Sequence, residues 1–140
     1  MIPAAFAAIT LLAPHVPHNE RLQDSIQFVA YAVANGLDPL LIVAVAFHES
    51  SFNREAVNQK SGAVGLMGIS RVHFDYVPGD WIWNIRTGTK LLAKAIHDCG
   101  GNIAKGLSLY NGRGKCKVSK YSTAVMKTWD LVRGMEVAER

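Results

Sequence analysis

An unbroken apolar run occupies residues 40–47 and is the clearest pattern in the chain. A helix without polar positions has no solvent-facing side, so the run predicts a helix that is buried all round. Asp38 and Pro39 precede it as an N-cap and a first-turn proline, which favours a helix over a buried strand. Glu49 therefore falls in the last turn of this helix, and polar, glycine-rich sequence follows it.

Apolar residues recur with helical spacing on both sides of this run. Before it, residues 19–35 form a predicted helix that ends at Gly36 and buries a face made of Leu22, Ile26, Val29, Ala30 and Val33. After it, we expect helices at 84–99, at 102–110 with Asn102 as the cap, and at 118–133 through Tyr121, Val125, Trp129 and Val132.

The helical period is lost between residues 52 and 69, where Gly62, Gly65 and Gly68 predict turns and a short, irregular hairpin. The next stretch is rich in aromatic residues, which either form a small local core or offer a platform for sugar stacking: Phe74, Tyr76, Trp81 and Trp83. The pattern as a whole predicts a single, mainly α domain with a small irregular hairpin region after Glu49.

The first 17 residues form an apolar segment that has no basic start and contains Pro3, Pro14 and Pro17. It is too short and too interrupted for a membrane-spanning helix. We expect residues 1–18 to be a retained segment, either packed on a domain of residues 19–140 or docked to a partner. An unusual export signal is the alternative.

At 140 residues, with 49% hydrophobic and 19% charged residues, the chain can bury a real core as one domain. Its net charge of +4 favours anionic partners, which include nucleic acids, acidic membranes and cell-wall polymers. The densest basic cluster, from Arg113 to Lys120, carries no nucleic-acid-binding signature, so we do not expect nucleic acid as a partner.

Cys99 and Cys116 are the two cysteines of the chain. They are too few for a zinc site of four thiolates. They either close a disulfide, which indicates an oxidising compartment, or remain two buried thiols. The spacing leaves both possibilities open.

Glu49 is the candidate for chemistry, because partial burial and the negative end of the helix dipole both raise a carboxyl pKa. Such a group is a general-acid candidate, although an ordinary solvated glutamate at a frayed helix end fits the pattern as well. His48-Glu49 does not complete the HExxH zinc motif, because residue 52 is Phe. We find no nucleophile elbow or phosphate-binding loop, and the sequence predicts no metal or cofactor.

Glycoside cleavage is the chemistry that remains. Most glycosidases use two carboxylates, but substrate-assisted families need only one from the protein. Asp75 and Asp80 are candidates to approach Glu49, yet neither follows an apolar helix as Glu49 does. A mechanism with one carboxylate is the more economical hypothesis.

Three ordered motifs resemble those of lytic transglycosylases, which are peptidoglycan-cleaving members of the lysozyme-like superfamily related to goose-type lysozymes. The motifs are Glu49-Ser-Ser-Phe-Asn53, Gly62-Ala-Val-Gly-Leu-Met67 and Leu109-Tyr-Asn-Gly112, with Asn84-Ile-Arg-Thr-Gly88 as a similar helix start between the last two. The resemblance covers about residues 22–130 and implies a lysozyme-like helical fold and peptidoglycan glycan strands as the substrate.

The resemblance also implies roles for individual residues. Glu49 is the expected sole catalytic acid/base, cutting between N-acetylmuramic acid and N-acetylglucosamine to leave a 1,6-anhydro end. Ser50 is expected to position Glu49 or the sugar, and the main chain of Met67 to hold an acetamido group. Tyr110 and Asn111 are expected to line the cleft, with Tyr121 near the reacting centre. Simple packing is the alternative for Ser50, for the Met67 side chain and for both tyrosines.

The sequence departs from the family pattern at three places. Gly68 stands where the family often has Gln, which removes a substrate-facing amide. Arg54 replaces a frequent proline, and Asn111-Gly-Arg-Gly114 replaces a commoner Asn-Ala-Gly. None of these departures changes the carboxylate of Glu49.

Two other functions fit the same residues: a hydrolytic goose-type lysozyme and a non-catalytic wall-binding subunit. In either case the expected location is the cell envelope. A compact domain of this kind suits local wall opening by a larger assembly, such as a secretion apparatus or a phage virion. The apolar N-terminal segment favours a phage virion or an assembled complex.

Overall fold

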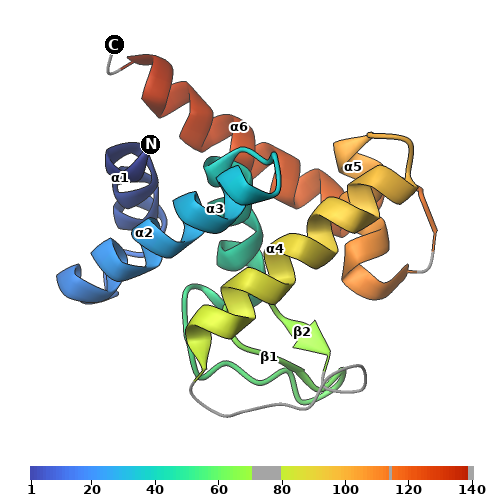
Figure 1. The fold of residues 1–140 in the computed structure, drawn as a ribbon, viewed down its shortest axis with the longest axis horizontal. Helices are drawn as coiled ribbons and strands as arrows, with labels where there is room; N and C mark the ends of the chain where they lie inside the picture. The colour runs from blue at the N-terminus through green and yellow to red at the C-terminus, as the bar shows by residue number, and fades with distance from the viewer. Residues whose placement is uncertain (71–79, 114, 139–140) are drawn as a thin grey trace.

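The computed structural model describes residues 1–70, 80–113 and 115–138. Their helices are α1 (Ile2–Leu12), α2 (His18–Ala34), α3 (Pro39–Ser50), α4 (Trp81–Asp98), α5 (Ile103–Ser108) and α6 (Lys120–Ala138). A small antiparallel sheet pairs β1 (Ala63–Val64) with β2 (Ile69–Ser70). The sheet lies beside α4, at the edge of a helical body (Figure 1). The mainly α fold with a hairpin after Glu49 is confirmed.

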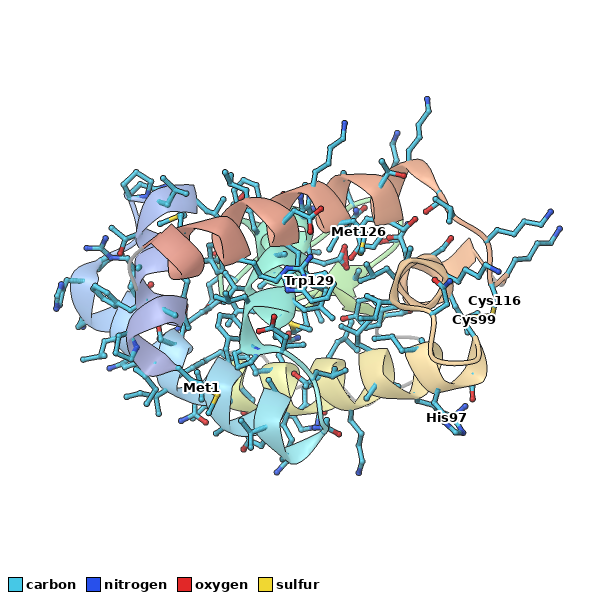
Figure 2. All side chains as sticks on the ribbon, turned by 90° about the horizontal axis from the view of Figure 1, so that it is seen from above. Met1, His97, Cys99, Cys116, Met126 and Trp129 are labelled. Carbon is cyan, nitrogen blue, oxygen red and sulfur yellow. A yellow bond between two sulfur atoms is a disulfide. The ribbon has the colours of Figure 1, made fainter. Side chains whose placement is uncertain are left out.

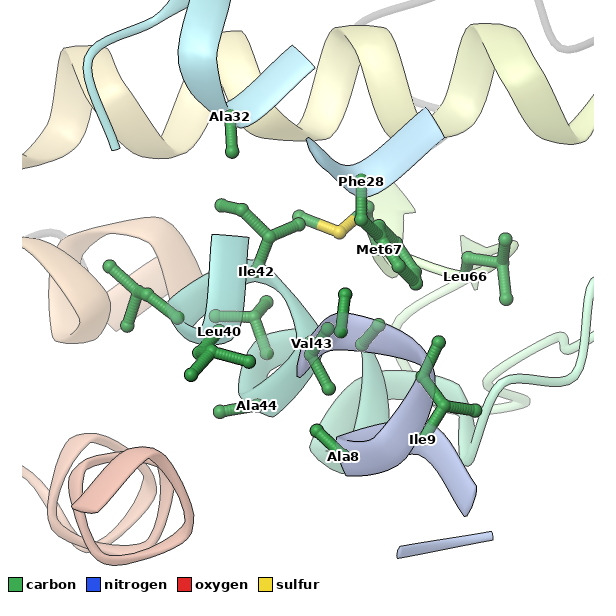
Figure 3. Packing of buried hydrophobic residues seen from close by; sticks show 14 of the residues in the cluster. Ala8, Ile9, Phe28, Ala32, Leu40, Ile42, Val43, Ala44, Leu66 and Met67 are labelled. Atoms are coloured by element: carbon green, nitrogen blue, oxygen red, sulfur yellow. The ribbon is translucent and has the colours of Figure 1, made fainter. Parts of the chain in front are cut away.

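The apolar run forms α3, the central helix, as predicted. Every residue from Leu40 to Ala46 is at most 3% exposed. Asp38 caps the helix by accepting a hydrogen bond of 2.9 Å from the Leu40 N–H, and its second oxygen accepts one of 2.9 Å from Trp129 of α6. Residues of α1, α2 and the hairpin turn surround α3 (Figure 3). Burial on all sides fixes the direction in which the last turn presents Glu49.

The predicted buried face of α2 is wrong at four of its five positions. Leu22, Ile26 and Val33 are 42%, 41% and 54% exposed and Ala30 is exposed as well, whereas Asp24 and Phe28 are fully buried. The neighbouring face of the same helix packs on α3 because Phe28 fills the core beside Phe52. A polar Asp24 on that face is tolerated because Arg54, 30 residues later, pairs with it.

The apolar N-terminal segment forms α1, which packs against α2 and α3. Its buried residues Ala5, Ala8 and Ile9 belong to the same hydrophobic core as α3. The division at residue 18 stays a prediction, since shared packing does not decide where a domain begins. In the described parts of the chain, no helix has the length and apolar character required to span a membrane.

α4 begins three residues earlier than predicted, at Trp81, because Asp80 caps it by accepting from the Trp83 N–H at 2.9 Å. The sequence did not predict this cap, because the aromatic residues around Asp80 were interpreted as part of the preceding stretch. The stacking candidates Phe74 and Tyr76, and the carboxylate Asp75, lie outside the described residues.

The segment from 102 to 113 also differs from the prediction. α5 is followed by a wide turn, η2 (Leu109–Arg113), in which Gly112 has a φ of 83°. The predicted cap of α5 is confirmed, because the Asn102 side chain accepts from the Lys105 N–H at 3.0 Å.

A disulfide joins Cys99, directly after α4, to Cys116 in the loop before α6. The Cα atoms are 5.4 Å apart and 17 residues separate the two positions. Figure 2 shows this bridge at the end of the molecule, while Trp129 and Met126 of α6 lie towards the interior. The bridge fixes the loop that leads from η2 to α6.

Candidate functional site

Glu49 lines a cleft of about 630 Å³ that lies between the end of α3, the hairpin and η2. The cleft is lined by Glu49, Ala56, Val57, Asn58, Ser61, Ala63, Gly65, Gly68, Ser70, Tyr110, Asn111 and Gly112. Burial raises the pKa of Glu49 from 4.5 to about 7. A carboxyl group with this pKa is substantially protonated near neutral pH, so it can donate a proton to a bound molecule.

No other carboxylate lines this cleft among the described residues. Asp80, one of the two candidates from the sequence, is exposed and is used as the cap of α4. No group of three potential metal-ligating acids, histidines or cysteines occurs in the described ranges either. Among the described residues, Glu49 is therefore the carboxyl group that can transfer protons in this cleft.

Ser50 faces the hairpin rather than open solvent. Its hydroxyl lies within hydrogen-bonding distance of two carbonyl oxygens, that of Ala46 at 3.0 Å and that of Leu66 at 2.9 Å. Because a hydroxyl has a single proton, the two acceptors share it. Ser50 thus connects the last turn of α3 to the hairpin turn, next to Glu49.

The main chain of Met67 already has partners within the protein. Its N–H donates to the Asn84 side chain at 2.8 Å, and its carbonyl accepts from the Tyr110 hydroxyl at 2.5 Å. The side chain is fully buried and packs near Phe28 and Ile42 (Figure 3). Met67 is also not among the residues that line the cleft, so its predicted contact with an acetamido group stays a prediction.

Tyr110 and Asn111 both line the cleft, and Tyr110 holds the hairpin turn through its hydroxyl. Burial and the nearby Glu49 carboxylate raise the pKa of Tyr110 well above its usual value. The same two causes raise the pKa of Tyr121, so both phenols stay protonated. The Tyr121 hydroxyl is buried and has no hydrogen-bond partner among the described residues. It is a donor in the electrostatic range of Glu49.

Asn84 supports the cleft from α4. The sequence indicated this residue only as part of a helix start. It is 3% exposed, donates to the Val64 carbonyl at 2.8 Å and accepts from the Met67 N–H at the same distance. Gly65 packs directly on it, since a Cβ at that position would lie 2.5 Å from the Asn84 Cγ. One α4 side chain thus holds both ends of the hairpin turn.

We expect Asn84→Ala to lower the free energy of unfolding by about 2–4 kcal/mol, because it leaves a buried N–H and a buried carbonyl without partners. Urea unfolding followed by tryptophan fluorescence measures this. Asn102→Ala is the control, since it removes an exposed helix cap worth about 1 kcal/mol. A loss at Asn84 no greater than the loss at Asn102 contradicts this role.

Residues 27–130 match the sequence model of the transglycosylase SLT domain. The chain belongs to the SLT transglycosylase family. SLT domains are lysozyme-like and act on cell-wall peptidoglycan, which implies peptidoglycan as the substrate and is consistent with the cell envelope as the location. The matched range contains every residue that lines the cleft, whereas α1 lies before it.

Within this SLT domain, the departure at Arg54 has a clear structural use. The guanidinium donates to Asp24 at 2.7 and 3.1 Å and to Gln23 at 3.1 Å, and its Cζ lies 3.7 Å from the ring centroid of Trp81. It therefore joins α2 to the first turn of α4. A proline at this position provides none of these contacts.

Proposed function

We propose that this SLT domain cleaves the β-1,4 bond between N-acetylmuramic acid and N-acetylglucosamine without water, leaving a 1,6-anhydromuramoyl end. The observation that carries the proposal is Glu49, which has a pKa of about 7 and is the one carboxylate that lines the cleft among the described residues. A single group suffices when the same carboxyl gives a proton to the leaving group and then accepts one from the nucleophile.

In the first step, protonated Glu49 donates to the glycosidic oxygen as the bond from that oxygen to C1 breaks. The acetamido group of the substrate stabilises the positive charge that develops at C1. In the second step, the Glu49 carboxylate takes the proton of the O6 hydroxyl while O6 bonds to C1. The carboxyl ends as it began, so the cycle needs neither water nor a cofactor.

The surrounding residues have supporting roles in this proposal. Ser50 holds the hairpin turn against the last turn of α3, which keeps the Glu49 backbone in place. The carbonyl of Met67 is the proposed acceptor for the acetamido N–H, and Asn111 contacts the sugar from the η2 side. Tyr121 donates to the Glu49 carboxylate or to the substrate, which gives its buried hydroxyl a partner.

The pH dependence of cleavage follows from the Glu49 pKa. The first step needs the protonated acid, which is lost as pH rises through about 7. We expect the rate on soluble glycan strands to be highest below pH 7 and to fall about tenfold per pH unit well above it. Initial rates from pH 5 to 9 measure this, and a rate that is unchanged to pH 9 contradicts the assignment.

Product analysis tests the reaction itself. Mass spectrometry of digested peptidoglycan should find 1,6-anhydromuramoyl ends, which are lighter by one water than reducing ends. Finding only reducing ends identifies the hydrolytic alternative, a goose-type muramidase. Absence of any cleavage by folded protein identifies the non-catalytic, wall-binding alternative.

The assembly in which this domain acts is proposed from the sequence alone. A small SLT domain suits local opening of the wall by a larger assembly, such as a secretion apparatus or a phage virion. Co-purification of such an assembly with the tagged protein tests this, and isolation of the protein alone from envelope fractions contradicts it.

A further inference from the structure

Gly68 directly contacts the catalytic side chain. It ends the hairpin turn with a φ of 62°, in the left-handed region that favours glycine. A Cβ built on it would lie 2.8 Å from Cδ of Glu49 and 3.2 Å from its Cβ, with the carboxylate Oε2 closer still. The carboxylate therefore occupies the space that a side chain at position 68 would need.

The hairpin has little freedom to make room for such a side chain. Asn84 hydrogen-bonds Val64 and Met67 on either side of the turn, and Tyr110 holds Met67 from the opposite side. The atoms in the way are the flexible end of Glu49. A side chain at position 68 would consequently displace the carboxylate before it displaced the backbone.

Gly68 also lies where two hollows meet. A second hollow of about 380 Å³, lined by parts of β2, α4 and η2, shares Gly68, Ser70, Tyr110 and Gly112 with the main cleft. Gly68 and Gly112 thus border both hollows with main chain alone. A side chain at either position would project from the lining that the two hollows share.

We propose that Gly68 is a positioning residue: its missing side chain leaves the space against the hairpin that the Glu49 carboxylate occupies, and a glutamine side chain at this position would take that space. This rests on the proposed function. It reverses the expectation from the sequence, in which Gly68 was only a lost substrate contact. Restoring glutamine here lowers activity instead of raising it.

Three asparagine variants separate the possible effects, because asparagine tolerates the left-handed region and adds a side chain. Gly36→Asn tests backbone strain alone, since Gly36 has a φ of 68° at the end of α2 and nothing within 4 Å of a built Cβ. Gly112→Asn adds a side chain to the lining of both hollows, since Gly112 borders each of them and also has open space around it. Gly68→Asn adds displacement of Glu49.

We expect Gly68→Asn and Gly68→Gln to lower kcat about 100-fold, as expected when a reacting group moves by about 1 Å. Gly112→Asn should raise KM with little change in kcat, and Gly36→Asn should leave both unchanged. Thermal unfolding of all four variants checks that each is folded. Unchanged kcat in folded Gly68→Asn, or an equal fall of kcat in Gly36→Asn or Gly112→Asn, overturns the proposal.

A second measurement needs no catalysis. Carbon-13 NMR titration of the Glu49 carboxyl should find its pKa closer to 4.5 in Gly68→Asn than in the wild type, because the displaced group gains solvent. The other two asparagine variants should keep the wild-type pKa. If the wild type cleaves nothing, the proposed function fails while this titration still tests the position of the carboxylate. An identical pKa in wild type and Gly68→Asn overturns the proposal.

Discussion

Glu49→Gln should abolish nearly all glycan cleavage while leaving the protein folded. Gln matches Glu in size, but it can neither donate a proton to the leaving oxygen nor accept one from O6. General acid–base catalysis contributes about 100- to 10,000-fold, so we expect kcat to fall by a factor in that range. Release of soluble fragments from purified peptidoglycan measures the loss.

The same substitution should raise stability at alkaline pH. Because the folded protein holds the Glu49 proton up to about pH 7, it binds more protons than the unfolded chain between pH 4.5 and 7. Wild-type stability therefore falls as pH rises through this window, and the neutral Gln avoids the penalty. We expect a Tm for Glu49→Gln at pH 8 that is at least equal to that of the wild type.

Glu55→Gln is the matched control, since it removes an exposed glutamate six residues further along the chain. It should change neither the cleavage rate nor the Tm. Retained cleavage by Glu49→Gln, or equal losses in the two variants, contradicts the assignment of Glu49. A lost rate together with a lowered Tm at pH 8 points to a structural role instead.

The apolar run and its flanking motifs predicted the central helix because the evidence for each is local. Asp38, Pro39 and the apolar residues 40–47 lie within one short stretch, so their pattern is sufficient for α3 and for the place of Glu49 in its last turn. The caps of later helices were predictable in the same way where a single residue carries them, as Asn102 does for α5.

Features that depend on distant partners were not predictable from the pattern. Two adjacent faces of α2 have the same helical spacing, and the buried one was decided by Phe28 and by an ion pair across 30 residues. The role of Gly68 was not predictable either, because it depends on a contact with Glu49, which belongs to another element. Only the folded chain shows that its missing side chain makes room for the carboxylate.

Arg54→Met should destabilise the protein strongly at neutral pH. Asp24 has no exposed surface, its Oδ1 accepts both Arg54 hydrogen bonds, and its Oδ2 has no partner among the described residues. Removing the guanidinium leaves an uncompensated buried charge, for which losses of about 3–5 kcal/mol are typical. Urea unfolding at pH 7.5 measures the change. Lys94→Met is the control, because its pair with Asp98 is exposed and worth under about 1 kcal/mol.

The loss should be smaller at pH 5 than at pH 7.5. Burial raises the pKa of Asp24 to about 6 despite Arg54, and the pKa rises further when Arg54 is removed. Asp24 is therefore largely protonated at pH 5, and a neutral carboxyl needs no counter-ion. For the same reason, Asp24→Asn combined with Arg54→Met should be more stable than Arg54→Met alone at pH 7.5. If the double and single variants are equally unstable at both pH values, the contribution of Arg54 is its packing on Trp81 rather than its charge.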